Sequence, residues 1–363
     1  MGKKSKRRRD RREKGRPVAA PGGASASAAD AAAAGGDQKR ARKIPEAARM
    51  FDKSSAGYRK LAWILHPITV ETFFSKYWEK KPLLIDRKDD RGHYFRPPPV
   101  DDTPEAAAAA AAAPKSNILS KKDIETFAKE GMFDFGMDLS VTKYINGSRA
   151  NFTPPENCST EAFSKWLWER FDDGCSIRLL SPHSFSENTF NLIRDVQTIF
   201  GSFASANSYL TPQDSQGFAP HYDDIEAFIL QLEGSKHWRV YEPIEGTLPT
   251  YASRDFDQAE VGAPIIEHTL RPGDLLYMPR GFVHQGVVPP SAGDASSAAA
   301  TSAPLAPHSL HLTVSAGYQN NWTFFLQELL KTALSAAASK NEVNAWGCRN
   351  PPPCHSQHHR KST

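Results

Sequence analysis

The sequence predicts a mainly β domain flanked by helices. Between residues 204 and 318, many short runs of β-branched and apolar residues alternate with Gly/Pro turns, and helical periodicity occurs on either side. Strands of this number and spacing are typical of a β-sandwich or a small barrel. The predicted strands cover 204–210, 218–222, 226–232, 236–241, 265–270, 274–278, 283–288 and 309–318.

Length and composition indicate one domain of this kind, although 363 residues would suggest two at roughly 100 to 200 residues each. Three stretches lack the apolar pattern of a core: the basic and Ala/Gly-rich residues 1–45, the run at 97–115 with eight consecutive alanines, and the Pro/Ala/Ser-rich residues 289–307. We therefore predict a domain at 57–320 that carries the last two stretches as low-complexity insertions.

The N-terminus is a basic arm. Residues 1–16 carry ten Lys/Arg against Asp10 and Glu13, whereas the whole chain has a net charge of +4. A block of like charges with almost no apolar residue should be disordered, so residues 1–56 are predicted to form an arm. We interpret it as a nuclear or nucleolar address with affinity for RNA phosphates. The alternative is a tail that only aids solubility.

Cysteine content and hydropathy exclude other classes of protein. The four cysteines, Cys158, Cys175, Cys348 and Cys354, are too few for a disulfide scaffold in a chain of this length, so a reducing compartment is expected. No apolar run approaches the ~20 residues that a membrane span needs. Lys and Arg occupy the place of a signal-peptide apolar stretch. We expect an intracellular protein without a membrane partner.

The remaining elements follow from caps and periodicity. Thr69 can cap a helix that Pro82 ends, and 83–85 has the character of a short buried strand. The alanines at 106–113 have high helix propensity, but prolines bracket them, and we interpret them as an insertion outside the core. Periodicity predicts helices at about 120–130, 160–171, 187–201 and 322–336, and strands at 141–145 and 175–180.

The segment 207–243 carries the residues that indicate chemistry. His221 and Asp223 stand at i and i+2, which on a strand places both side chains on one face, with Cα atoms about 7 Å apart. A second imidazole would complete a two-His-one-carboxylate triad, which binds Fe(II) and leaves coordination positions open. His284, in the run GDLLYMPRGFVHQ, can supply it. Each histidine taken alone would more often be an ordinary core or surface residue.

An iron with open positions also needs an oxidant and two electrons. If 2-oxoglutarate supplies the electrons, its distal carboxylate requires a cation inside the barrel. Lys236 is a candidate because it follows the hairpin turn Glu233-Gly234-Ser235 and begins a predicted strand. A lysine at that position is otherwise expected to be exposed.

Three runs resemble the JmjC ribosomal oxygenases: YLTPQDSQGFAPHYDDIEAFILQLEGSKHWRVY, GDLLYMPRGFVHQ and SLHLTVSAGYQNNW. FFSKYWEKKPLLI and GCSIRLLSPHSF are also similar to the family, so the resemblance covers about 60–335. Proteins of this family are nuclear and nucleolar Fe(II)- and 2-oxoglutarate-dependent dioxygenases that hydroxylate histidines of ribosomal proteins. Some members are also described as histone lysine demethylases. The resemblance implies a double-stranded β-helix of the jelly-roll or cupin type with flanking helices.

The resemblance also implies roles for individual residues. His221, Asp223 and His284 would bind Fe(II), and Lys236 would hold the distal carboxylate of 2-oxoglutarate, with O2 as the second co-substrate. The other residues implied in the 2-oxoglutarate pocket are Tyr209, Thr313, Asn207 and His311. The implied partner is a ribosomal protein or a histone.

Two departures from the family pattern concern the C-terminal half. The insertion SAGDASSAAATSAPLAP should loop out of the barrel. Family members continue into a helical dimerisation region and a winged-helix domain. Here only residues 321–345 could begin the dimerisation region, so the sequence does not decide whether the chain forms a homodimer. The tail 346–363 has cysteines and histidines without a usual zinc spacing, and we expect it to be disordered. The alternative functions are a non-catalytic nuclear or ribonucleoprotein-binding cupin module and a small-molecule oxygenase.

Overall fold

The computed structural model describes residues 52–97, 99, 103–112, 117–290, 306–317 and 322–339. The predicted basic arm lies almost wholly outside the described residues. Most of the predicted insertion at 289–307 and the whole predicted tail at 346–363 also lie outside them.

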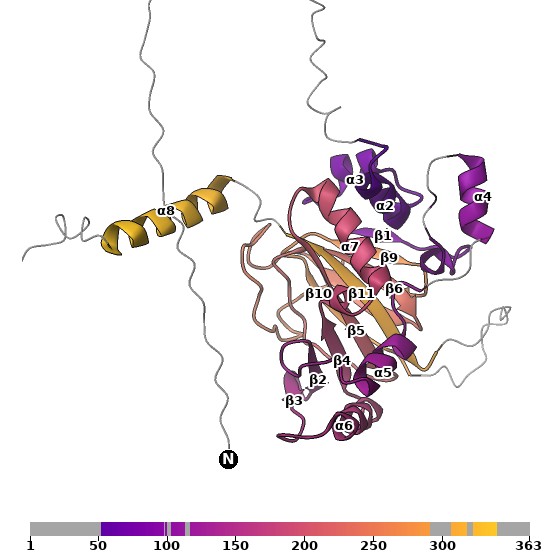
Figure 1. The fold of residues 1–363 in the computed structure, drawn as a ribbon, viewed down its shortest axis with the longest axis vertical. Coiled ribbons are helices and arrows are strands. Elements are labelled where there is room, and N and C mark those ends of the chain that lie inside the picture. Colours follow the sequence, from indigo (N-terminus) through magenta and orange to yellow (C-terminus); the bar gives the residue numbers. More distant parts are fainter. Residues whose placement is uncertain are drawn as a thin grey trace, which may run out of the picture. The chain divides into compact units, whose positions relative to one another are not determined.

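Two antiparallel sheets form the body of the domain (Figure 1). The strands of the eight-stranded sheet, in spatial order, are β1 (Leu83–Ile85), β9 (Leu275–Met278), β6 (Glu226–Glu233), β11 (His308–Ala316), β5 (Ala204–Pro212), β4 (Ser176–Leu180), β2 (Leu139–Ile145) and β3 (Ser148–Phe152). The smaller sheet consists of β10 (Val283–Val287), β7 (Lys236–Tyr241) and β8 (Ile266–Leu270). The mainly β, cupin-type fold predicted from the sequence is confirmed.

Two tight turns carry the chain from the large sheet to the small one. Gly234, with φ of +58°, joins β6 to β7, and a Cβ there would lie 1.6 Å from the His308 carbonyl oxygen, so only glycine fits. Gly281, with φ of +91°, lies between β9 and β10. From β6 onward the chain therefore crosses between the sheets repeatedly, with β7, β8 and β10 in the small sheet and β6, β9 and β11 in the large one, as in a double-stranded β-helix.

The predicted strand at 218–222 is wrong. In its place His221 forms a single antiparallel bridge with His284, through His221 N–H to His284 O at 3.2 Å and His284 N–H to His221 O at 2.8 Å. Pro220 precedes the bridge and has no N–H to donate, which prevents a longer ladder.

The described residues form seven α-helices: α2 (Ala56–Leu65), α3 (Val70–Lys76), α4 (Pro104–Ala112), α5 (Lys121–Lys129), α6 (Thr160–Asp172), α7 (Glu187–Phe200) and α8 (Trp322–Ser339), with short 3-10 turns at His93–Phe95 and Pro182–Ser184. Helices were predicted at all of these places except those of α2 and α4. Thr69, Ser120, Ser159 and Ser186 cap α3, α5, α6 and α7 with their hydroxyl groups. No helix among the described residues is long and apolar enough to cross a membrane.

The alanine run forms α4, and α8 covers the predicted helix at 322–336. Helix formation in α4 follows from the high helix propensity of alanine, and most of its described residues are exposed. In α8 the apolar residues Phe325, Leu326, Leu329, Leu330 and Leu334 are exposed. The expectation of a homodimer through this region stays a prediction.

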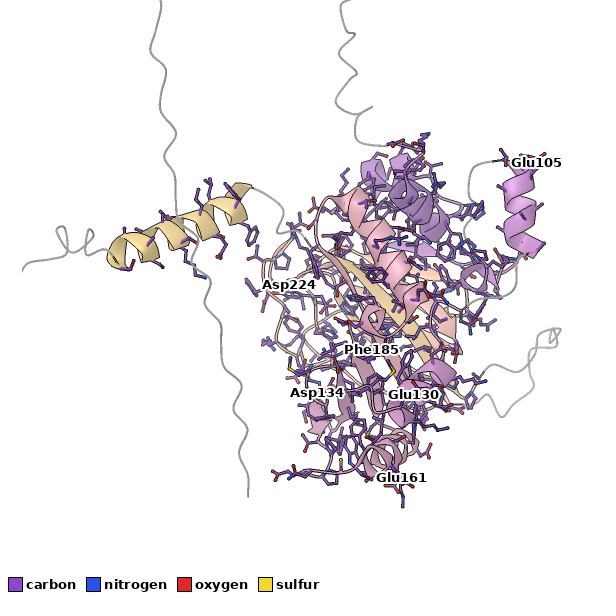
Figure 2. The ribbon with its side chains drawn as sticks, in the orientation of Figure 1. Glu105, Glu130, Asp134, Glu161, Phe185 and Asp224 are labelled. Atoms are coloured by element: carbon purple, nitrogen blue, oxygen red, sulfur yellow. The ribbon has the colours of Figure 1, made fainter. Side chains whose placement is uncertain are left out.

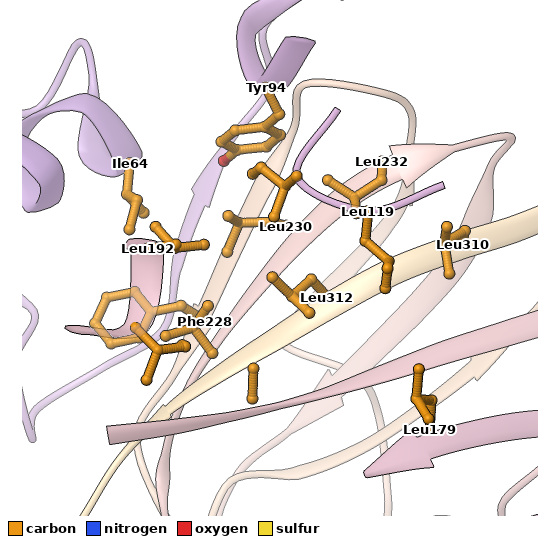
Figure 3. Packing of buried hydrophobic residues seen from close by; sticks show 14 of the residues in the cluster. Ile64, Tyr94, Leu119, Leu179, Leu192, Phe228, Leu230, Leu232, Leu310 and Leu312 are labelled. Atoms are coloured by element: carbon orange, nitrogen blue, oxygen red, sulfur yellow. The ribbon is translucent and has the colours of Figure 1, made fainter. Parts of the chain in front are cut away.

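The main core lies between the large sheet and the helices, and strand alternation separates it from the interior of the barrel. Leu310 and Leu312 of β11 pack in this core with Phe228 and Leu230 of β6 and with Leu192 of α7 (Figure 3). Side chains of a strand alternate between faces, so the residues between these leucines point to the opposite side of the sheet. The fold thereby directs His311 and Thr313 into the space between the two sheets.

Candidate active site

A pocket between the two sheets brings His221, Asp223 and His284 together. The Asp223 carboxylate lies 4.0 Å from His221 Nε2 and 3.7 Å from His284 Nε2, and the two imidazole rings have centroids 4.6 Å apart. Two donors bonded to one ion at roughly 2.0–2.2 Å can be at most about 4.4 Å apart. The three side chains therefore fit a single metal ion.

Backbone carbonyls orient both imidazoles toward this centre. His221 Nδ1 donates to Ala219 O at 2.8 Å, and His284 Nδ1 donates to Phe282 O at 3.0 Å. A carbonyl only accepts, so Nδ1 carries the proton and Nε2 keeps its lone pair for a metal. Burial lowers the pKa of His284 to about 4, which also favours the neutral imidazole.

The backbone of Asp223 is held from the β9–β10 turn. Gly281 N–H donates to Asp223 O at 3.0 Å. At this glycine a Cβ would lie 2.6 Å from Pro249 Cδ, and its positive φ also disfavours a side chain. Asp224, the residue after Asp223, lies among the connecting loops at the left of the domain in Figure 2.

A second cluster, Asp86, His268 and Asp274, has ligand atoms close enough for a metal but is an ion-pair network. Arg91 donates to Asp274 at 2.6 Å and to Asp86 at 3.1 Å. Asp274 also accepts the backbone N–H groups of Arg87 and Arg271 at 2.8 Å each. A guanidinium between the carboxylates neutralises the charge that a cation would need.

Lys236 lies in the same pocket as the triad. It is 4% exposed, and the hydrogen bond recorded for its ammonium runs to Thr211 Oγ1 at 3.3 Å. Among the described residues no carboxylate forms an ion pair with it, and burial lowers its pKa to about 7. A buried ammonium usually has an anionic partner, so the pocket is suited to the carboxylate of a bound molecule.

Aromatic rings form one wall of the pocket. His311 stacks on Tyr209 at 4.9 Å between ring centroids and meets Trp238 edge-on at 5.2 Å. Burial, followed by the charge of Lys236, holds the pKa of His311 well below its usual value, so the ring is neutral. Burial, assisted by Asp223, raises the pKa of Tyr209 to about 12, so its hydroxyl stays protonated and can donate.

The sequence-predicted residues converge, with one exception. Seven of the eight line the pocket: Tyr209, His221, Asp223, Lys236, His284, His311 and Thr313. Asn207 is not among the lining residues; it faces Thr313 across β5 and β11.

Comparison with known proteins agrees with the geometry. A family model described as "JmjC domain" matches residues 178–306. Ribosomal oxygenase 1 of Gallus gallus is 39% identical over 295 residues, which cover 81% of this chain and 42% of that protein. Ribosomal oxygenase 1 of Danio rerio is 37% identical, over 82% of this chain and 48% of that protein. The chain belongs to the JmjC ribosomal oxygenase family.

Two further similarities complete the comparison. The protein named bifunctional lysine-specific demethylase and histidyl-hydroxylase NO66 of Aedes aegypti is 37% identical, over 79% of this chain and 39% of that protein. An X-ray structure of E. coli ycfD superposes with a TM-score of 0.48 at 17% identity, covering 82% of this chain and 63% of that one. The JmjC chain described here spans less than half the length of the curated relatives named above.

Several lining residues of the JmjC pocket were missed from the sequence. Trp238 and Gly286 stand two residues after Lys236 and His284 on their strands, so the alternation that identified the face could also have identified them. A Cβ at Gly286 would lie 2.8 Å from Lys236 Cε, so this glycine makes room for the lysine stem. Thr211, which contacts the Lys236 ammonium, follows Tyr209 by two residues in the same way, whereas Gln285 had no recognisable pattern.

Proposed function

We propose that this chain is an Fe(II)- and 2-oxoglutarate-dependent dioxygenase. One observation carries the proposal: a converging pair of imidazoles and a carboxylate share a pocket with a buried lysine that forms no ion pair with a described carboxylate. The triad is suited to Fe(II), and the lysine is suited to the distal carboxylate of a keto acid. The names of the relatives, oxygenase and hydroxylase, support the same chemistry.

Each group in the pocket has a proposed task. With Fe(II) bound, 2-oxoglutarate, O2 and a substrate C–H yield succinate, CO2 and a C–OH, one oxygen atom entering succinate and the other the substrate. His221, Asp223 and His284 hold the metal through Nε2, carboxylate and Nε2. Lys236 anchors the co-substrate, with Tyr209 and Thr313 as further donors. Trp238 and His311 exclude water beside the ammonium, which strengthens its pairing.

We propose a basic protein as the substrate, most simply a histidine of a ribosomal protein or a methylated lysine of a histone. The relatives' names point to these two classes. The loop between β7 and β8 adds support, since residues 242–265 carry five acidic side chains and one arginine. This loop packs on the ligand segment through Tyr222 N–H to Ser253 Oγ at 2.8 Å and Phe256 N–H to Pro220 O at 2.8 Å.

Intact-mass analysis of candidate substrates tests this function. The chain would be incubated with Fe(II), 2-oxoglutarate and either ribosomal proteins or methylated histone peptides, while succinate is measured. A hydroxylated histidine gains one oxygen atom, whereas a hydroxylated N-methyl group is lost as formaldehyde and the substrate loses a methyl. Absence of succinate with every substrate, and without one, would favour the non-catalytic binding module.

We further propose that the arm directs the protein to the nucleus, and within it to nucleoli, through contact with RNA. Its net charge of +8 over residues 1–16 supports this proposal. Phosphate contacts release counterions, so RNA affinity of the arm should fall steeply with salt. Deleting residues 1–16 should disperse a tagged protein from nucleoli and leave turnover of a short peptide unchanged. Continued nucleolar accumulation would place the address elsewhere in the chain.

A further inference from the structure

Glu226 is a fully buried carboxylate next to the triad that the proposed chemistry does not use. It begins β6, three residues after Asp223, and is 0% exposed. Because a buried charge is costly unless it is paired and hydrogen-bonded, its partners show what it does in the fold. Those partners lie on and beside the β9–β10 turn, four residues before His284.

Two groups contact the Glu226 carboxylate from this turn and strand. The Tyr277 hydroxyl donates a short hydrogen bond to Oε2. Arg280 approaches Oε1 with its backbone N–H at 3.5 Å and with Nε at 4.0 Å. Glu226 therefore connects the segment that carries His221 and Asp223 to the turn that precedes His284.

The same turn supplies backbone contacts to two members of the triad. Gly281 N–H holds the Asp223 carbonyl at 3.0 Å, and Phe282 O holds His284 Nδ1 at 3.0 Å. Arg280 stands one residue before Gly281 and two before Phe282. A shift of the turn would therefore move the Asp223 backbone and rotate the His284 ring together.

The turn that follows α3, at residues 77–80, contacts the network from outside the barrel. Glu79 N–H donates to the Tyr277 hydroxyl at 3.0 Å, and the Glu79 carboxylate accepts from Arg280 Nη2 at 3.3 Å. Glu79 has φ of +54°, a conformation that costs a non-glycine residue free energy and is kept where surrounding contacts impose it. Trp78 stacks on the Tyr277 ring with centroids 6.2 Å apart.

We propose that Glu226 is a positioning residue that fixes the β9–β10 turn and thereby sets the relative placement of Asp223 and His284 for metal binding. It acts through Arg280 and Tyr277 and does not touch the metal. The inference rests on the proposed metal site. Groups that orient metal ligands from behind typically change metal affinity by 10- to 100-fold when they are replaced.

Co(II) titration of Glu226→Gln tests the proposal without any turnover. The amide keeps the shape of the side chain, but it cannot accept from Tyr277 and from Arg280 at once. We expect roughly tenfold weaker Co(II) binding and an altered visible absorption spectrum of the bound ion. Glu233→Gln is the matched control, because Glu233 ends the same strand and is bonded to Lys121 N–H at 3.1 Å and His308 at 2.7 Å, away from the turn.

The outcomes separate this inference from the metal site itself. Absence of Co(II) binding by the unmodified chain would refute the metal site and this inference with it. Unchanged affinity and an unchanged spectrum in folded Glu226→Gln would refute the positioning role alone, as would equal losses in Glu233→Gln. If Glu226→Gln does not fold, Tyr277→Phe removes one of the two groups that hold the carboxylate. Wild-type Co(II) binding in that variant would then overturn the proposal.

Discussion

Replacing Lys236 with methionine should weaken 2-oxoglutarate strongly and leave the metal site intact. Methionine fills a similar apolar volume, so the change removes the charge from a residue that is 4% exposed. Breaking one side of a buried ammonium–carboxylate pair costs roughly 3 to 5 kcal/mol. At about 1.4 kcal/mol per factor of ten, the Michaelis constant for 2-oxoglutarate should rise by about two to four decades.

The measurement is succinate formation against 2-oxoglutarate concentration, with Co(II) affinity measured in parallel. Lys60→Met is the control, because Lys60 is also largely buried but pairs with Asp195 at 3.7 Å and does not line the pocket. An unchanged Michaelis constant in Lys236→Met would show that the lysine does not meet the co-substrate. An equal loss of Co(II) binding would show that its role is structural and that the proposed division of tasks is wrong.

Three further predictions concern the same pocket. His221→Ala should abolish 2-oxoglutarate turnover and Co(II) binding while circular dichroism stays that of the folded chain; full activity would exclude His221 as a ligand. Gly286→Ala should raise the Michaelis constant for 2-oxoglutarate, because the new methyl meets Lys236 Cε at 2.8 Å, whereas Gly92→Ala, with open space around it, should not. The affinity for 2-oxoglutarate should fall as pH rises above about 7, where the Lys236 amine of the free pocket loses its proton. In Lys236→Arg the pH dependence over this range should disappear, and a persistent dependence would assign the titration to another group.

Strand alternation made much of the site predictable. Along β11, Leu310 and Leu312 belong to the core cluster while His311 and Thr313 line the pocket, as the period of two requires. The convergence of His221 and His284 was predicted although His221 does not lie in a regular strand. A single bridge between the two residues is sufficient, because it holds their backbones side by side as a longer ladder would have done.

Local backbone properties explain where the strand pattern failed. A strand at 218–222 satisfied the apolar pattern, but the proline inside it interrupts the ladder. In the alanine run, the high helix propensity noted in the sequence produces α4, and most of its described residues are exposed.

Depth of burial, in contrast, could not be predicted from the pattern, because it depends on residues far away in the sequence. A lysine that begins a strand is ordinarily exposed, and Lys236 is buried because Gly286, on the adjacent strand β10, leaves room for its stem while Trp238 covers it. Glu226 begins a strand in the same way, and its burial follows from Tyr277 and Arg280, more than fifty residues later. The two charges that matter most near the triad therefore look ordinary in the sequence. Their buried environments form only when the two sheets pack against each other. The residues proposed to act near the triad therefore stand at positions that the sequence alone predicts to be exposed.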